Sequence, residues 1–133
     1  MDLENEDKYY DFRVKNAVFY PRTNKVQYHK PYIYAAQKKL LINMKRIFKD
    51  HKTNFKMVFS PAYDQLTLDT TDLNYLKGLF GKECVYDFSG INDLNMDIHN
   101  FYDDHYKASV ANRMMDIIYS SNADDSLKKI FHR

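Results

Sequence analysis

Three blocks within residues 84–119 decide the predicted fold: Cys84-Val-Tyr-Asp-Phe-Ser-Gly90, Asn100-Phe-Tyr-Asp-Asp-His-Tyr106 and Met114-Met-Asp-Ile-Ile-Tyr119. The first block is β-prone and predicts a buried strand. The second lies in a loop rich in Asp, Asn and His, and the third belongs to an amphipathic segment that predicts a helix over residues 108–120. Because the loops that follow strands in an α/β sheet hold ligands and catalytic groups, the loop around His105 is the candidate site.

The residues before this stretch alternate between helical and β patterns. Apolar residues recur at three- and four-residue steps through 34–50, which predicts a helix packed on a sheet. Residues 55–60 predict a strand, and residues 85–88 predict the next one. Between them, Thr71–Asp72 as an N-cap and Gly81 as the end predict a helix. This alternation predicts an α/β fold with a small, mostly parallel sheet. Parallel sheets are usually covered by helices on both faces, so we expect a partial three-layer sandwich.

The two ends of the chain lack this alternation. Residues 1–11 are charged and aperiodic, which predicts a frayed lead-in. Residues 14–20 and 25–29 are β-prone and flank Pro21-Arg-Thr-Asn24, a turn-forming sequence, so they predict an N-terminal β-hairpin. The predicted organisation is a lead-in over 1–11, a single incomplete α/β domain over 12–121, and a polar tail over 122–133 with a short turn at 127–131.

Charge and composition argue against several classes of function. A net charge of +2 gives no reason to expect a nucleic-acid partner, and the lysines crowded into residues 38–56 predict a solvated face. The single cysteine, Cys84, excludes an internal disulfide and a cysteine-built zinc site. No stretch approaches the roughly 20 apolar residues of a membrane span. The acidic N-terminus is not a secretory signal, so the sequence predicts neither a signal nor an anchor.

The candidate loop also contains residue types that bind metals. Asp97, His99, Asp103, Asp104 and His105 could together supply a site of histidine and carboxylate ligands. Their spacing matches no strict ligand pattern, and loops are commonly rich in these residues. We therefore expect no metal. No phosphate-loop or dinucleotide-binding sequence is present, so we expect no cofactor either.

The order of motifs over residues 33–120 resembles the C-terminal half of SGNH/GDSL-type hydrolases. The resemblance rests on Met57-Val-Phe-Ser-Pro61, on Val85-Tyr-Asp-Phe-Ser-Gly90, and on the Asp/His loop at 100–106 with the helix after it. The chain looks like the branch of cell-envelope O-acyltransferase-like proteins, which includes the lipoteichoic acid D-alanyl transfer and alginate O-acetylation proteins. The resemblance implies ester hydrolysis or acyl transfer through Ser, His and Asp. It also implies an acyl-ester or envelope-polysaccharide substrate and a place in the cell envelope.

The resemblance further implies that His105 is the catalytic base and that Asp103 or Asp104 orients it. The family pattern is Asp-x-x-His, whereas here Tyr102 lies three residues before His105, Asp103 two before it and Asp104 beside it. The family's Gly-Asp-Ser nucleophile block is absent from the 133 residues. Gly90-Ile-Asn-Asp93 matches the family's Gly-x-Asn-Asp block but lies too near His105, so we interpret it as coincidental. Because a base without a nucleophile forms no acyl intermediate, we expect the chain alone to be inactive.

Two hypotheses follow for the function. In the first, the chain supplies the Asp and His part of an SGNH-like esterase or O-acyltransferase site. In the second, it is a non-catalytic α/β structural or interaction module. An incomplete sheet leaves a strand edge unpaired, and such edges favour association. We therefore expect the isolated chain to self-associate through an exposed sheet edge.

Overall fold

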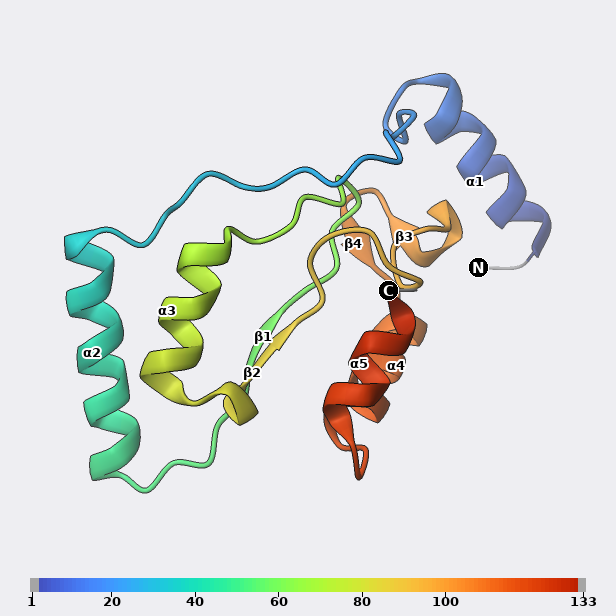
Figure 1. Ribbon diagram of the computed structural model, residues 1–133. Helices are drawn as coiled ribbons and strands as arrows, with labels where there is room; N and C mark the ends of the chain where they lie inside the picture. The colour runs from blue at the N-terminus through green and yellow to red at the C-terminus, as the bar shows by residue number, and fades with distance from the viewer. Residues whose placement is uncertain (1–2, 132–133) are drawn as a thin grey trace.

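The computed structural model describes residues 3–131, and its architecture is mixed α/β. Figure 1 shows the elements in chain order: α1 (Leu3–Lys15), α2 (Ala35–Asp50), β1 (Met57–Phe59), α3 (Thr70–Phe80), β2 (Val85–Asp87), β3 (Phe101–Tyr102), β4 (His105–Tyr106), α4 (Ala108–Ile118) and α5 (Ala123–Ile130). Short 3-10 turns at Lys82–Cys84 and Ile98–Asn100 precede β2 and β3. The helices and strands predicted between residues 34 and 120 are therefore confirmed, with ends that differ by a few residues.

β1 and β2 form the parallel pair that the sequence predicts. Their register places Met57 beside Val85 and Val58 beside Tyr86. Since successive side chains of a strand point to opposite faces, Val58 and Tyr86 share one face and Met57 and Val85 share the other. Helices α2 and α3 lie on one side of this pair in Figure 1, and α4 and α5 lie on the other. The fold is thus a small three-layer α/β arrangement, as predicted.

The layer of α2 and α3 packs on the face that carries Val85. Leu76 and Phe80 of α3 are buried against Val85, and half-buried residues of α2 contact the same cluster. The N-cap of α3 is Asp69, whose carboxylate accepts the backbone N–H of Asp72, so the helix begins earlier than predicted. The buried Asp72 carboxylate instead accepts backbone N–H groups just before α2, at Tyr32 and Ile33, and so ties that segment to α3.

The layer of α4 and α5 packs on the opposite face. Phe88 and Leu94 are fully buried with Val110, Met114 and Ile118 of α4. Residues 123–130 form α5 instead of the polar tail that the sequence predicts, and residues 132–133 of that prediction lie outside the described residues. The helix is capped by the Asn122 side chain, and Ile130 reaches the same core, which explains why this end of the chain is ordered.

The N-terminal region differs most from the prediction. Residues 3–15 form α1, not a frayed lead-in, while residues 1–2 of that prediction lie outside the described part of the chain. The predicted hairpin of residues 14–20 and 25–29 is wrong, because the described residues 14–29 contain no strand. The segment between α1 and α2 is extended and makes a single parallel bridge, Tyr28 to Thr67.

The length and polarity of the helices bear on membrane insertion. Among residues 3–131, the structure has no helix that is both long and apolar enough to cross a membrane.

Candidate functional site

The predicted loop folds as a short antiparallel hairpin. β3 and β4 pair Tyr102 with His105, which leaves Asp103 and Asp104 as the two residues of the turn. Asp103 has a φ of 55°, a left-handed conformation that Asp adopts more readily than most residues. Phe101, at the start of the hairpin, is fully buried and anchors it to the protein. The local sequence therefore places two carboxylates and an imidazole at one exposed turn.

His105 and Asp104 form the pair that faces solvent. The distance between His105 Nε2 and Asp104 Oδ1 is 3.4 Å, and the two side chains are 88% and 86% exposed. At this exposure the contact contributes little to stability. The contact uses Nε2, so Nδ1 of the imidazole is left for another partner. Of the two carboxylates that the sequence offers as partners for His105, the structure places Asp104 in contact with it.

Asp103 is held by α1 instead. The hydroxyl of Tyr9 donates to Asp103 Oδ1 at 3.0 Å and accepts the backbone N–H of Asp103 at 3.1 Å. Arg13 Nη1 lies 3.0 Å from the same carboxylate oxygen. Burial of the Tyr9 phenol, together with its bond to Asp103, raises the pKa of Tyr9. Tyr9 and Arg13, about ninety positions before the hairpin in sequence, therefore hold its turn in place.

A second set of contacts joins α1 to the residue after the hairpin. The Lys107 ammonium forms an ion pair with the Glu6 carboxylate and lies 5.2 Å from the centre of the Tyr10 ring. The hydrogen bond from Lys107 lowers the pKa of Glu6. Burial alone would lower the pKa of Lys107, but the bonds to Glu6 and Tyr10 and the electrostatic effects of Tyr10 and Tyr102 together outweigh it and raise that pKa. Tyr10 is buried and its hydroxyl donates to the Phe101 carbonyl at 2.6 Å.

The hairpin lies at the carboxyl end of the parallel pair. Ser60 directly follows β1, and its hydroxyl donates to the Tyr106 hydroxyl at 3.4 Å. Figure 1 shows β3 and β4 beyond the same end of β1 and β2. This is the edge of an α/β sheet at which ligands commonly bind.

Ser89 and Asn92, which belong to the sequence motifs at residues 84–93, form hydrogen bonds with backbone groups. The Ser89 hydroxyl accepts the backbone N–H of Leu68. Asn92 is buried, and its amide donates to the carbonyls of Phe88 and Gly90. These bonds hold the turn after β2, so the Asn92 amide is engaged within its own turn and does not face the hairpin.

A second His–Asp pair lies a few residues before the hairpin. His99 Nδ1 lies 2.8 Å from Asp97 Oδ1, and the same oxygen accepts the backbone N–H of His99. The backbone bond lowers the pKa of Asp97, and the side-chain bond acts in the same direction. The His99 ring lies 4.3 Å from the Tyr10 ring, centre to centre. This pair therefore caps the 3-10 turn and provides an internal comparison for His105.

The candidate metal ligands do not converge. Within residues 3–131, no group of three or more His, Cys, Asp or Glu side chains is placed to hold a metal ion. The loop residues instead divide into two separate pairs, Asp97 with His99 and Asp104 with His105, while Asp103 turns to α1.

Comparisons with known proteins give no further information. No protein family, no curated protein and no solved structure matches the chain. The resemblance of residues 33–120 to SGNH/GDSL-type hydrolases therefore remains a prediction from the residues quoted above.

Proposed function

We propose that this chain supplies the base of an SGNH-like ester hydrolase or O-acyltransferase site, with His105 as the base and Asp104 as its carboxylate. One observation carries the proposal: the Asp104–His105 pair is exposed at the carboxyl end of the parallel strands. An exposed imidazole beside a carboxylate, at the edge where α/β proteins commonly bind ligands, is open to a substrate.

The chemistry follows from the geometry of the pair. Asp104 Oδ1 lies 3.4 Å from Nε2, so in the proposed chemistry it accepts the proton of Nε2 and leaves Nδ1 to accept the proton of a serine hydroxyl. The serine oxygen then attacks the ester carbonyl, and the imidazolium returns the proton to the leaving alcohol. Within residues 3–131, His105 has no contact with a serine hydroxyl. The nucleophile must therefore come from a further segment or from a second protein.

Asp103 takes a positioning role in this proposal. Its carboxylate is bound to Tyr9 and Arg13, and it does not contact the imidazole. The contacts hold the turn against α1 and thereby fix the direction in which Asp104 and His105 project. The sequence offers Asp103 and Asp104 equally as partners of His105, and the side-chain contacts favour Asp104.

The test is ester hydrolysis by the chain joined to the coding sequence that precedes it in its genome. We expect 4-nitrophenyl acetate to be hydrolysed by the extended protein, and His105→Gln to lower kcat by about 100- to 10,000-fold, as for loss of a general base. His99→Gln is the matched control, because His99 is also paired with a carboxylate in the same loop. Equal activity in the wild-type and His105→Gln proteins would reject His105 as the base.

A second candidate function is a non-catalytic interaction module. It is favoured by α2, which has no fully buried residue and exposes Leu40, Met44 and Ile47 along one face. Such a helix offers an apolar surface to a partner or to another copy of the chain. If no serine-bearing segment precedes the chain and the protein forms dimers that Leu40→Gln disrupts, this function replaces the catalytic one.

A further inference from the structure

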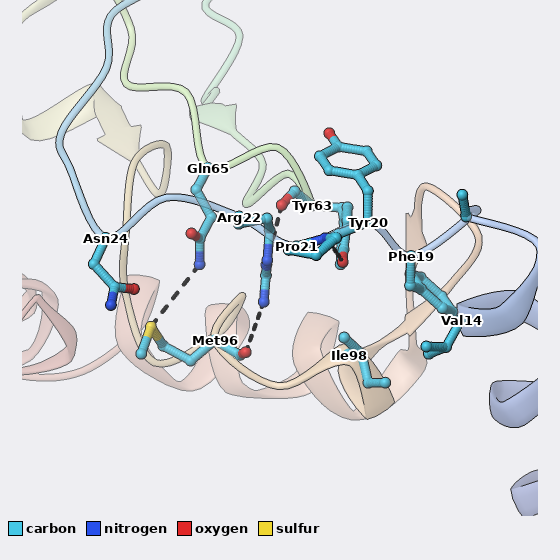
Figure 2. Close-up of a pocket in the computed structure, with 11 residues that line it drawn as sticks. Val14, Phe19, Tyr20, Pro21, Arg22, Asn24, Tyr63, Gln65, Met96 and Ile98 are labelled. Atoms are coloured by element: carbon cyan, nitrogen blue, oxygen red, sulfur yellow. Dashed lines mark hydrogen bonds between the residues drawn. The ribbon is translucent and has the colours of Figure 1, made fainter.

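A cavity of about 480 Å³ lies between the segment that follows α1 and two loops of the main fold. It is drawn in Figure 2, and its lining includes Val14, Phe19, Arg22, Asn24, Gln65 and Ile98. Its volume falls within the range of small-molecule sites, roughly 300–1,000 Å³. No residue of the His105 hairpin lines it, so this cavity is separate from the candidate catalytic pair.

The Arg22 side chain lies in the middle of the cavity lining in Figure 2. Nη1 donates to the carbonyls of Tyr63 and Asn95, and Nη2 donates to the carbonyl of Met96 at 2.7 Å. The guanidinium carbon also lies 4.3 Å from the centre of the Tyr63 ring. Among the described residues these bonds leave Nε–H and one Nη2–H for another acceptor.

Arg22 forms no ion pair within the described residues. All three of its hydrogen bonds are to neutral carbonyls, and it forms no ion pair with a carboxylate of residues 3–131. None of the 11 residues that line the cavity is acidic. Asp64 lines an adjoining pocket together with Arg22, but its carboxylate accepts the backbone N–H of Leu66 and forms no ion pair with the guanidinium. A half-buried guanidinium without an ion-pair partner favours an anionic ligand.

The two ends of the cavity differ in polarity. Figure 2 shows Asn24 and Gln65 on one side of Arg22, and Val14, Phe19 and Ile98 on the other. The Phe19 ring is buried against Tyr10 and Tyr63, so this wall is fixed by the aromatic core that also holds α1. A ligand that reaches both ends needs a charged head and an apolar chain.

We infer that this cavity binds a carboxylate that carries a short apolar chain. The carboxylate accepts from the free N–H groups of Arg22, and the chain extends along Val14 and Ile98. Arg22 is suited to this because a guanidinium recognises a planar carboxylate through two parallel hydrogen bonds. The inference concerns a site other than His105 and holds whichever function the hairpin serves.

The test is a ¹H–¹⁵N NMR titration of the chain with three small probes. Hexanoate has both the charge and the chain, acetate has the charge alone, and 1-hexanol has the chain alone. We expect hexanoate to shift the amides around Arg22 and Gln65 saturably, and acetate and 1-hexanol to bind at least about tenfold more weakly. Equal binding of hexanoate and 1-hexanol would overturn the role of Arg22, and no saturable shift would overturn the site.

Variants separate the ligand role of Arg22 from its structural one. Arg22→Gln should weaken hexanoate binding by about tenfold or more. Because Arg22→Gln also loses the bonds to carbonyls, Val14→Asp provides a second test. Val14 is half exposed, so the new carboxylate repels the carboxylate of the ligand without disturbing the core. Arg46→Gln, on the surface of α2, is the control and should bind hexanoate as the wild type does. Undiminished binding by a folded Val14→Asp protein would contradict the inference.

Discussion

Helices α1 and α2 have similar lengths, 13 and 16 residues, but they are held in opposite ways. α1 is polar, yet its side chains reach the hairpin through Glu6, Tyr10 and Arg13. α2 has a clear apolar stripe, yet no residue of it is fully buried, and Leu40 is 68% exposed. Apolar periodicity therefore predicts where a helix forms, whereas the residues that contact the helix decide how firmly it is held.

This difference predicts that the two regions respond differently to substitution. α1 fixes the turn that carries His105, so the candidate catalytic pair projects from an anchored hairpin. α2 leaves apolar side chains open on the other side of the fold. Substitutions at the two helices should therefore have different consequences, the first on stability near the site and the second on association.

Among substitutions in the two compared helices, the largest effect is expected at Tyr10, the buried ring of α1. Tyr10→Ala removes an aromatic side chain that packs on Phe19 and should lower the free energy of unfolding by about 3 kcal/mol. Tyr10→Phe keeps the ring but loses the bond to the Phe101 carbonyl, so it should cost about 1 kcal/mol. Urea denaturation followed by circular dichroism measures both values. A cost under about 0.5 kcal/mol for Tyr10→Ala, as at a surface position, would show that α1 is not anchored as described.

A smaller effect is expected from the turn carboxylates. Asp103→Asn keeps a residue that tolerates the left-handed backbone but loses the charge opposite Arg13, and should cost about 0.5–1 kcal/mol. Asp104→Asn is the matched neighbour, whose exposed carboxylate contacts only His105 among the described residues, so we expect a cost within about 0.5 kcal/mol. Chemical denaturation of both variants tests this order. The reverse order would contradict the assignment of Asp103 to α1.

Acid should loosen α1. The bond from Lys107 lowers the pKa of Glu6, so the folded chain favours the ionised carboxylate. The stabilisation is therefore complete above about pH 4.3, the ordinary pKa of Glu, and is lost as pH falls through the lowered value. Hydrogen-exchange protection of the α1 amides, compared with that of the α3 amides, should fall over this range. Glu6→Gln should remove most of this pH dependence, and an unchanged dependence would assign it to another group.

The smallest effect on stability is expected at α2. Leu40→Gln replaces an exposed side chain and should change the free energy of unfolding by less than about 0.5 kcal/mol. Leu76→Ala, in the buried contact of α3, is the contrast and should cost about 2–5 kcal/mol. Sedimentation of the wild-type and Leu40→Gln proteins then measures whether this surface causes association. Identical self-association of the two proteins would exclude Leu40 from the interface.

The sequence predicts a helix or strand correctly where the signal lies within the residues of that element. The stripe of α2, the Gly81 end of α3, where φ is 94°, and the β-prone runs of β1 and β2 are local signals, and each element forms where expected. α1 carries no such signal, because its stability depends on contacts with residues about ninety positions away. The short bridge of Tyr28 to Thr67 shows why the hairpin prediction is wrong: the β-prone run pairs with a distant loop.

The candidate site is predicted in part. The Asp/His loop can be found from sequence because its polar residues are contiguous, and the structure keeps Asp104 beside His105. The roles of Tyr9 and Arg13 could not be found, because nothing in the sequence of α1 indicates which carboxylate it contacts. The Arg22 cavity could not be found either, since it depends on three carbonyls from two separate loops.

The most direct test of the proposed chemistry is the intact mass of the extended protein after brief mixing with 4-nitrophenyl acetate. If His105 activates a serine, an acetyl adduct should form on that serine in the wild-type and His99→Gln proteins and should be absent from the His105→Gln protein. An adduct that forms on the same serine at the same rate without His105 would contradict the proposal, and the exposed pair would then have no catalytic role.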